Sequence, residues 1–250
     1  MASSFDAPRT GDVSVLEQDP DLGAALAPEE LRLATDRVRA PVQALDDAAL
    51  NDAAARWDGS TCVGLLVLDG LLLRTLTIGD RSATELVGAG DLLRPWENED
   101  ELRMVPCEVE WHVLEPARAA LLDERFATAV APWPQVWRAL LERATRRTRS
   151  LAVATTLSHM NRVDQRLLLL FWHFAERWGR VRPDGVVVRL PLTHETLGAL
   201  IGARRPSVTS GLSQLARDGV VIPGERGEWV LTEAGRARVD AVRRAALRAA

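Results

Sequence analysis

Apolar residues recur at helical spacing twice between Leu192 and Ile222, and a short break at Gly202 separates the two runs. Thr193 is a suitable N-cap for the first run, and Gly219 stands just beyond the second, where helices commonly end. The apolar positions are Leu197, Leu200 and Ile201 in the first run and Val208, Leu212 and Leu215 in the second. Two short helices joined by a glycine-containing turn form a helix-turn-helix.

Strand-like runs flank these two helices. Val186–Leu190 precedes them, and Val220–Ile222 and Trp229–Leu231 follow, with turn-forming residues in Pro223–Gly227 between the last two. The order of strand, helix, turn, helix and hairpin predicts a winged helix-turn-helix. Domains of this kind place the second helix in the major groove of duplex DNA, so double-stranded DNA is the expected partner.

The second predicted helix begins with two arginines and carries short polar side chains. Such groups donate hydrogen bonds to phosphates and to base edges. The candidate DNA-binding residues are Thr193, Arg204, Arg205, Ser207, Thr209, Ser210, Gln214 and, in the predicted wing, Arg226.

At these residues the chain resembles the Crp/Fnr family of bacterial transcription regulators. The resemblance implies that Gly198 allows a close helix crossing and that Arg205 is the first base-contacting arginine. Pro206 and Ser210 stand where the family has a glutamate and a second arginine. Pro206 is compatible with the first turn of a helix, but the family's usual operator sequence does not follow. The matching positions are Leu192-Thr193, Leu197-Gly198, Ile201-Gly202, Arg205, Val208, Leu212, Leu215 and Gly219-Val220-Val221.

Charge is distributed unevenly along the chain. Residues 180–250 hold 12 arginines and 7 acidic residues, a net charge of about +5, whereas residues 1–179 hold 19 arginines and 28 acidic residues, about −9. A basic C-terminal part is typical of a DNA-binding module attached to a second, different module.

Short apolar runs alternate with turn signals between Thr61 and Trp96, which predicts a small antiparallel barrel or jelly roll. The turn signals are Asp69-Gly70, Gly79-Asp80 and the stretch from Gly88 to Asp91. The segment Gly64–Gly70 and the later Gly90-Asp91 resemble the cyclic-nucleotide-binding-like barrel of the same family.

The family's cyclic-nucleotide site is not matched in this chain. The resemblance implies a glutamate for the ribose and an arginine for the phosphate after Gly-Asp, but Leu92–Leu102 is acidic from Glu97 to Glu101, which repels a phosphate. We therefore expect no dependence on cyclic AMP, and the effector is unknown. Trp96 and Trp111 are candidates either for a pocket that takes a neutral or cationic ligand or for core packing. A cyclic-nucleotide-responsive regulator is the alternative.

An amphipathic helix is expected from Pro134 to about Leu157. In the family this helix pairs with its copy as a coiled coil, so the resemblance implies a homodimer. A core helix of the same subunit is the alternative. The residues expected in the dimer interface are Trp137, Leu140, Leu141, Ala144, Leu151 and Ala154.

The expected architecture is α+β, with an N-terminal antiparallel β-barrel or jelly roll, a long dimerisation helix and a C-terminal winged helix-turn-helix. The predicted parts are a loose tail at 1–21, a sensor barrel at 22–133, the dimerisation helix at 134–158 and the DNA-binding domain at 159–250. The polar N-terminus lacks a signal-peptide core, and no apolar run is long enough to span a bilayer. We therefore expect a cytoplasmic protein with no membrane partner.

Cofactor and catalytic signatures are weak. Cys62 and Cys107 are too few for a four-cysteine cluster and lie in strand-like segments, which favours packing. His173 and Glu176 form an isolated i, i+3 pair, a poor metal site. We therefore expect neither metal nor cofactor, and no catalytic residues. The function predicted is transcription regulation by a homodimer on an inverted-repeat operator, with RNA polymerase a further candidate partner. An enzyme that uses the winged helix as a scaffold is the alternative from another class.

Overall fold

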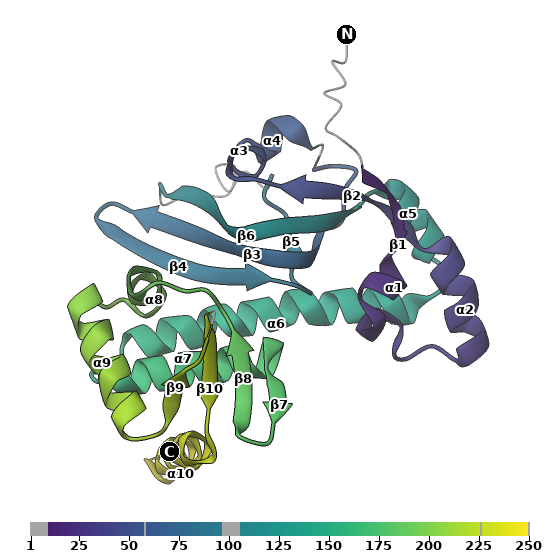
Figure 1. Ribbon diagram of the computed structural model, residues 1–250. Helices are drawn as coiled ribbons and strands as arrows, with labels where there is room; N and C mark the ends of the chain where they lie inside the picture. The colour runs from purple at the N-terminus through teal and green to yellow at the C-terminus, as the bar shows by residue number, and fades with distance from the viewer. Residues whose placement is uncertain (1–9, 58, 97–105, 226, 250) are drawn as a thin grey trace. The chain divides into compact units, whose positions relative to one another are not determined.

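The computed structural model describes residues 10–57, 59–96, 106–225 and 227–249. The chain divides into two compact units, Met1–Arg149 and Ser150–Ala250. Each unit combines helices with an antiparallel sheet (Figure 1), so the predicted α+β class is confirmed.

The N-terminal unit is built on a six-stranded antiparallel sheet. The path through it is β1 (Thr10–Ser14), β2 (Arg39–Leu45), β6 (Glu108–Leu122), β3 (Gly64–Ile78) and β4 (Arg81–Gly88), and β5 (Leu92–Leu93) pairs with β3. Gly79-Asp80 forms the predicted hairpin turn, since Ile78 pairs with Arg81. Among the described strands, β1 and β4 are the two ends of this path and do not pair with each other, so the sheet is antiparallel as predicted but is not closed into a barrel.

Strand β3 continues through Asp69-Gly70 instead of turning there as predicted. Its pairing with β6 shifts register between Val67 and Leu72, which marks a bulge in a strand of 15 residues. Gly70 has a φ of +89°, and a Cβ atom at this position would collide with the backbone of Ala117. Gly70 therefore allows β3 and β6 to approach closely, and the chain does not reverse direction there.

Residues 10–21 belong to the fold, contrary to the loose tail predicted for residues 1–21. β1 pairs with β2, and α1 (Val15–Gln18) and the 3-10 helix η1 (Pro20–Gly23) follow directly. Val15 and Leu16 of α1 and Leu22 of η1 are at most 3% exposed. They are too few to form a recognisable period in the sequence. The part of the prediction that concerns residues 1–9 lies outside the described residues.

Both faces of the sheet are buried, because β3 alternates between two cores. Leu65 and Val67 belong to one core together with Trp57, Trp96 and Trp111, which supports packing as the role of Trp96 and Trp111. Helices α3 (Asp47–Asn51) and α4 (Ala53–Arg56) supply further members of this core. Cys62 lies two residues before β3 and Cys107 directly before β6, so neither is within a strand as predicted, and both are half-buried. Cys62 packs against this core, as expected.

The second core of this unit gathers around Leu66 on the opposite face of β3. Figure 1 shows α1, α2 (Pro28–Arg37) and α5 (Glu124–Val130) near β1, and these helices contribute Leu16, Ala34 and Phe126. The first half of α6 (Pro134–Ser158) completes this core.

Side chains of helix α3 bind the backbone of β6 along a part of that strand that has no neighbouring strand on one side. β2 pairs only with Ala117–Ala120 of β6. Before that stretch, the side chain of Asn51 donates to the Trp111 carbonyl at 2.9 Å and accepts from the Trp111 N–H at 2.8 Å. Asp47 accepts the Val113 N–H at 2.6 Å, and this hydrogen bond is the main reason that the pKa of Asp47 is lowered. The side chains of α3 thus replace a missing strand.

Helix α6 spans the predicted residues, but not all of its apolar stripe is available to a partner. Leu140 is 2% exposed in the second core, and Trp137 packs edge-on against Phe126 with ring centroids 6.2 Å apart. These two residues therefore serve the core of their own subunit. Leu141 and Leu151 are 68% and 38% exposed.

Arginines on α6 fix the helix to the N-terminal unit. Arg143 donates to Asp19 at 2.7 Å, and the two side chains are only 11% and 13% exposed. Burial raises the pKa of Asp19 although the charge of Arg143 opposes this rise. One turn later, Arg147 lies 2.6 Å from Glu85. Arg143 and Arg147 therefore have structural roles.

The C-terminal unit is a winged helix-turn-helix, as predicted. Helix α7 (Val163–Trp178) supports a four-stranded sheet in the order β7-β8-β10-β9. The strands are β7 (Arg180–Arg182), β8 (Gly185–Arg189), β9 (Val221–Pro223) and β10 (Glu228–Leu231). Helices α8 (His194–Ile201) and α9 (Arg205–Arg217) lie between β8 and β9, and α10 (Glu233–Ala249) follows β10.

We expect Arg143→Gln to lower the free energy of unfolding of the N-terminal unit by about 3 kcal/mol, because it leaves the buried Asp19 carboxylate without its partner. Urea denaturation followed by tryptophan fluorescence measures the change. Arg138→Gln is the matched control, because the Arg138 side chain is 67% exposed, and should cost less than about 1 kcal/mol. Equal effects of the two variants would show that the Arg143 pair is not structural.

Candidate nucleic-acid interface

Local backbone signals set the geometry of the helix-turn-helix. The Thr193 hydroxyl accepts the Thr196 N–H at 3.0 Å, which caps the start of α8. Gly202 ends α8 with a φ of +64°, and the chain then folds back over Gly198. A Cβ atom on Gly198 would lie 2.5 Å from the carbonyl oxygen of Ala203, so a close approach requires glycine there, as the resemblance implies.

The second helix of the motif, α9, is seated on α7 by one buried face. Gly211 is the point of closest approach, because a Cβ atom there would lie 2.9 Å from the Cδ1 atom of Leu167 on α7. The helix ends at Gly219, with a φ of +64°, and the Val220 N–H donates to the Leu215 carbonyl at 2.9 Å. This is a Schellman ending. The buried residues of α9 are Val208, Gly211, Leu212 and Leu215.

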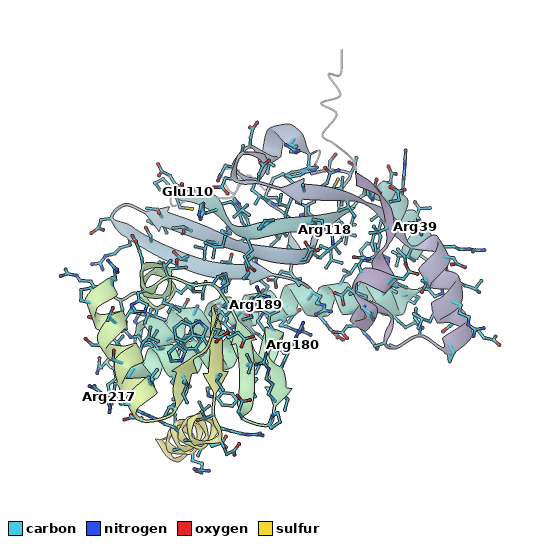
Figure 2. All side chains as sticks on the ribbon, viewed as in Figure 1. Arg39, Glu110, Arg118, Arg180, Arg189 and Arg217 are labelled. Atoms are coloured by element: carbon cyan, nitrogen blue, oxygen red, sulfur yellow. The ribbon has the colours of Figure 1, made fainter. Side chains whose placement is uncertain are left out.

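The opposite face of α9 is polar and open to solvent. Among the predicted DNA-binding residues, this face and the residue before the helix expose Arg204, Arg205, Ser207, Thr209 and Ser210. Helical spacing from Pro206 places Ser210, Ser213 and Arg217 on one outward stripe. Ser213 and Arg217 were not predicted as site residues, although the same i, i+4, i+7 and i+11 spacing indicates them. Figure 2 shows Arg217 at the C-terminal end of α9.

Three predicted contact residues already have hydrogen bonds within the domain. Thr193 caps α8. The Thr209 hydroxyl donates to the Arg205 carbonyl at 3.1 Å and lies 2.9 Å from His194 Nδ1. Since the hydroxyl has a single proton, Nδ1 is the donor in this second bond. The bond joins α8 to α9.

Gln214 is held at both ends of its amide. Its Nε2 donates to Asp218 at 2.7 Å, and its Oε1 accepts from Arg217 at 2.7 Å. The side chain therefore braces the last turn of α9. The hydrogen bonds of Thr193, Thr209 and Gln214 position α8 and α9 within the domain.

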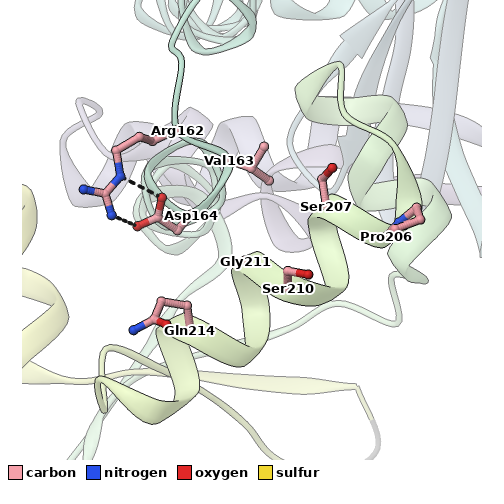
Figure 3. Close-up of a pocket in the computed structure, with 8 residues that line it drawn as sticks. All are labelled: Arg162, Val163, Asp164, Pro206, Ser207, Ser210, Gly211 and Gln214. Atoms are coloured by element: carbon pink, nitrogen blue, oxygen red, sulfur yellow. Dashed lines mark hydrogen bonds and ion pairs between the residues drawn. The ribbon is translucent and has the colours of Figure 1, made fainter.

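A shallow open pocket separates the start of α7 from α9. Figure 3 shows Arg162 and Asp164 on the α7 side, paired by bonds of 3.1 and 2.8 Å. Burial would raise the pKa of Asp164, but the hydrogen bond and charge of Arg162 and the charge of Arg238 outweigh it and lower that pKa. Sequence reasoning missed Arg162 and Asp164, because they precede the motif by about thirty residues. The α9 side is lined by Pro206, Ser207, Ser210, Gly211 and Gln214.

Exposed arginines continue beyond α9. Arg180 on β7 and Arg189 on β8 are at the surface (Figure 2). Arg182 instead pairs with Glu228 of β10 at 3.1 Å. Arg226, predicted to contact DNA from the wing, lies outside the described residues. Guanidinium groups of this kind suit phosphate oxygens.

The described part of the chain contains no group of three or more His, Cys, Asp and Glu side chains arranged to hold a metal ion. Within the same residues, no helix combines the length and the apolar character needed to cross a bilayer.

Comparison with known proteins agrees with this geometry. Residues 161–235 match the model of the Crp-like helix-turn-helix domain. No curated protein matches the sequence. Among solved structures, a CooA mutant from Carboxydothermus hydrogenoformans is 17% identical, with a TM-score of 0.54, over 70% of this chain and 76% of that one. A cyclic nucleotide-binding domain containing protein from Listeria monocytogenes EGD-e is 13% identical, with a TM-score of 0.54, over 66% and 78%.

FixK2 from Bradyrhizobium japonicum is a third similar structure, 18% identical with a TM-score of 0.50, over 69% of this chain and 83% of that one. At these identities the structures establish a shared fold. The class of protein follows from the C-terminal domain, a winged helix-turn-helix with an exposed polar second helix: the chain is a DNA-binding transcription regulator. Its residues 161–235 form a Crp-like helix-turn-helix domain, which follows a sheet-rich N-terminal unit.

Proposed function

We propose that the protein binds an inverted-repeat operator as a homodimer and places α9 of each subunit in a major groove. One observation carries this proposal: the apolar face of α9 is buried on α7, while the opposite face presents arginine and hydroxyl groups to solvent. A helix with one buried apolar face and one exposed polar face can enter the major groove of DNA, which is wide enough to admit an α-helix. Two such helices related by two-fold symmetry call for half-sites about one helical turn apart.

Arg205 is the residue proposed to contact a base, and Arg204 a phosphate. Arg205 is the first residue of α9 and is exposed, whereas Arg204 is the N-cap, outside the helix. A guanidinium that enters the groove can bind the O6 and N7 atoms of a guanine together. Pro206 and Ser210 occupy the remaining positions at this end, so the operator should differ from the usual one of the family.

The remaining proposals concern partners and location. A regulator that acts on chromosomal DNA works in the cytoplasm, and RNA polymerase is the partner through which it would alter transcription. The fold relatives include a protein named for a cyclic nucleotide-binding domain. In this chain Arg94 donates to the carbonyls of Val63 and Gly59 at 3.4 and 3.3 Å, an arrangement that does not direct its charge to a phosphate. We therefore propose that DNA binding does not need a cyclic nucleotide.

Arg205→Ala should weaken binding to a selected operator by about 1–3 kcal/mol and change binding to random DNA much less. Arg204→Ala should weaken both by similar factors, because a phosphate contact carries no sequence information. Fluorescence anisotropy with a selected and a scrambled duplex at several salt concentrations gives both affinities. If Arg205→Ala weakens the two duplexes equally, Arg205 is a phosphate contact and the proposed base contact is wrong.

Leu141→Glu should raise the dissociation constant of the dimer at least about tenfold, because it places a charge on the exposed apolar stripe of α6. Leu33→Glu is the matched control, since Leu33 is a similarly exposed leucine, 55% against 68%, on α2. Light scattering of the free protein and of its DNA complex measures the assembly. A wild-type monomer in both states would exclude the proposed dimer.

Cyclic AMP and cyclic GMP should neither bind at micromolar concentration nor alter operator affinity. A ligand that binds the folded state raises the melting temperature by mass action, so thermal shift and calorimetry detect it. Saturable binding that disappears in Arg94→Ala would show that the N-terminal unit is a cyclic-nucleotide sensor.

A further inference from the structure

One arginine of the C-terminal helix joins three elements of the DNA-binding unit. The Nη1 atom of Arg238 on α10 lies 2.9 Å from Asp218, the residue that caps the end of α9. Its Nη2 atom lies 2.8 Å from Asp164 in the first turn of α7. The Arg238 side chain is 27% exposed and that of Asp164 only 11%. A single guanidinium thus bridges two carboxylates on different helices.

The bridge continues to the surface of α9. Asp218 uses its other oxygen to accept from Gln214, whose amide oxygen accepts in turn from Arg217. Arg217 is exposed at the C-terminal end of α9. A line of hydrogen bonds therefore runs from Arg238 to the polar face of α9.

Hydrogen bonds near the ends of α9 add to its apolar contacts. At Gly211 the helix crosses α7 with no Cβ atom between them, a contact that fixes the distance between the two helices. The hydrogen bonds at Thr209 and at Asp218 act near the two ends of α9. Of these two hydrogen bonds, the one at Asp218 connects α9 to both α7 and α10, because its donor Arg238 on α10 also binds Asp164 on α7.

We propose that Arg238 is a positioning residue for DNA recognition, which fixes the C-terminal end of α9 so that its outward side chains meet base edges in one orientation. The inference rests on the proposed function of α9 as the base-contacting helix. Arg238 itself touches no base in this scheme. It acts through Asp164 and Asp218, and α10 is accordingly a strut of the recognition helix and not an accessory phosphate-binding tail.

The test compares Arg238→Gln with Arg236→Gln, a matched control on the same helix, where Arg236 is exposed. The probes are a duplex selected by the wild-type protein from a random library and a random-sequence duplex of equal length. Arg238→Gln should weaken binding to the selected duplex roughly tenfold, as for the loss of a coupled network. Binding to the random duplex and the salt dependence of both should not change. Amide hydrogen exchange in α9 of the free protein should quicken. Arg236→Gln should leave the preference for the selected duplex and α9 exchange unaltered.

Other outcomes overturn the proposal. Equal weakening on both duplexes, with a salt slope smaller by about one, would make Arg238 a phosphate contact. A lower melting temperature with unchanged affinities and unchanged α9 exchange would make it merely structural. If Arg238→Gln does not fold, Asp218→Asn provides the test, because it removes only the α9 end of the bridge and keeps the pair with Asp164. If the wild-type protein enriches no sequence, the proposed function fails, whereas the exchange measurement still decides whether Arg238 holds α9.

Discussion

The burial of one face of α9 on α7 is the contact on which the arrangement of the C-terminal unit depends. Val208, Leu212 and Leu215 are almost fully enclosed, and burial of each large apolar side chain contributes about 1.5–3 kcal/mol. Because Gly211 brings the two helices into direct contact, the seat of α9 allows little translation. The opposite face then has only one direction in which to point. The packing of the core therefore sets the direction of the proposed DNA-binding surface, and the hydrogen bonds of polar residues at the helix ends hold its orientation.

The winged helix-turn-helix was predictable because its determinants are local. The Thr193 cap, the left-handed Gly202 and the Schellman glycine at position 219 each act within a few residues, and the apolar period of α9 continues between them. A single sequence contains all of that information. The same applies to the turn at Gly79-Asp80, where a two-residue loop closes a hairpin.

The features that sequence reasoning missed depend on partners far along the chain. Asp69-Gly70 has turn-forming composition, yet β6 passes beside it and a bulge results. Leu140 falls at a coiled-coil position in the apolar pattern of α6, but its side chain is buried in the core that the N-terminal residues form. The hydrogen bonds of Gln214 depend on side chains that α9 brings together only when folded. Periodicity indicates that a side chain is buried or polar, and it does not indicate which surface or side chain it meets.

The side-chain pairing between α3 and β6 affects how the protein behaves among its own copies. A strand edge with unsatisfied N–H and C=O groups is a template for another chain, and such edges lead to sheet extension and aggregation. Asn51 occupies both backbone groups of Trp111, and Asp47 occupies the next outward N–H, so three of the groups that a passing strand would need on this stretch are already bonded. Two short polar side chains thus disfavour intermolecular β-pairing at an edge that a sheet not closed into a barrel leaves open.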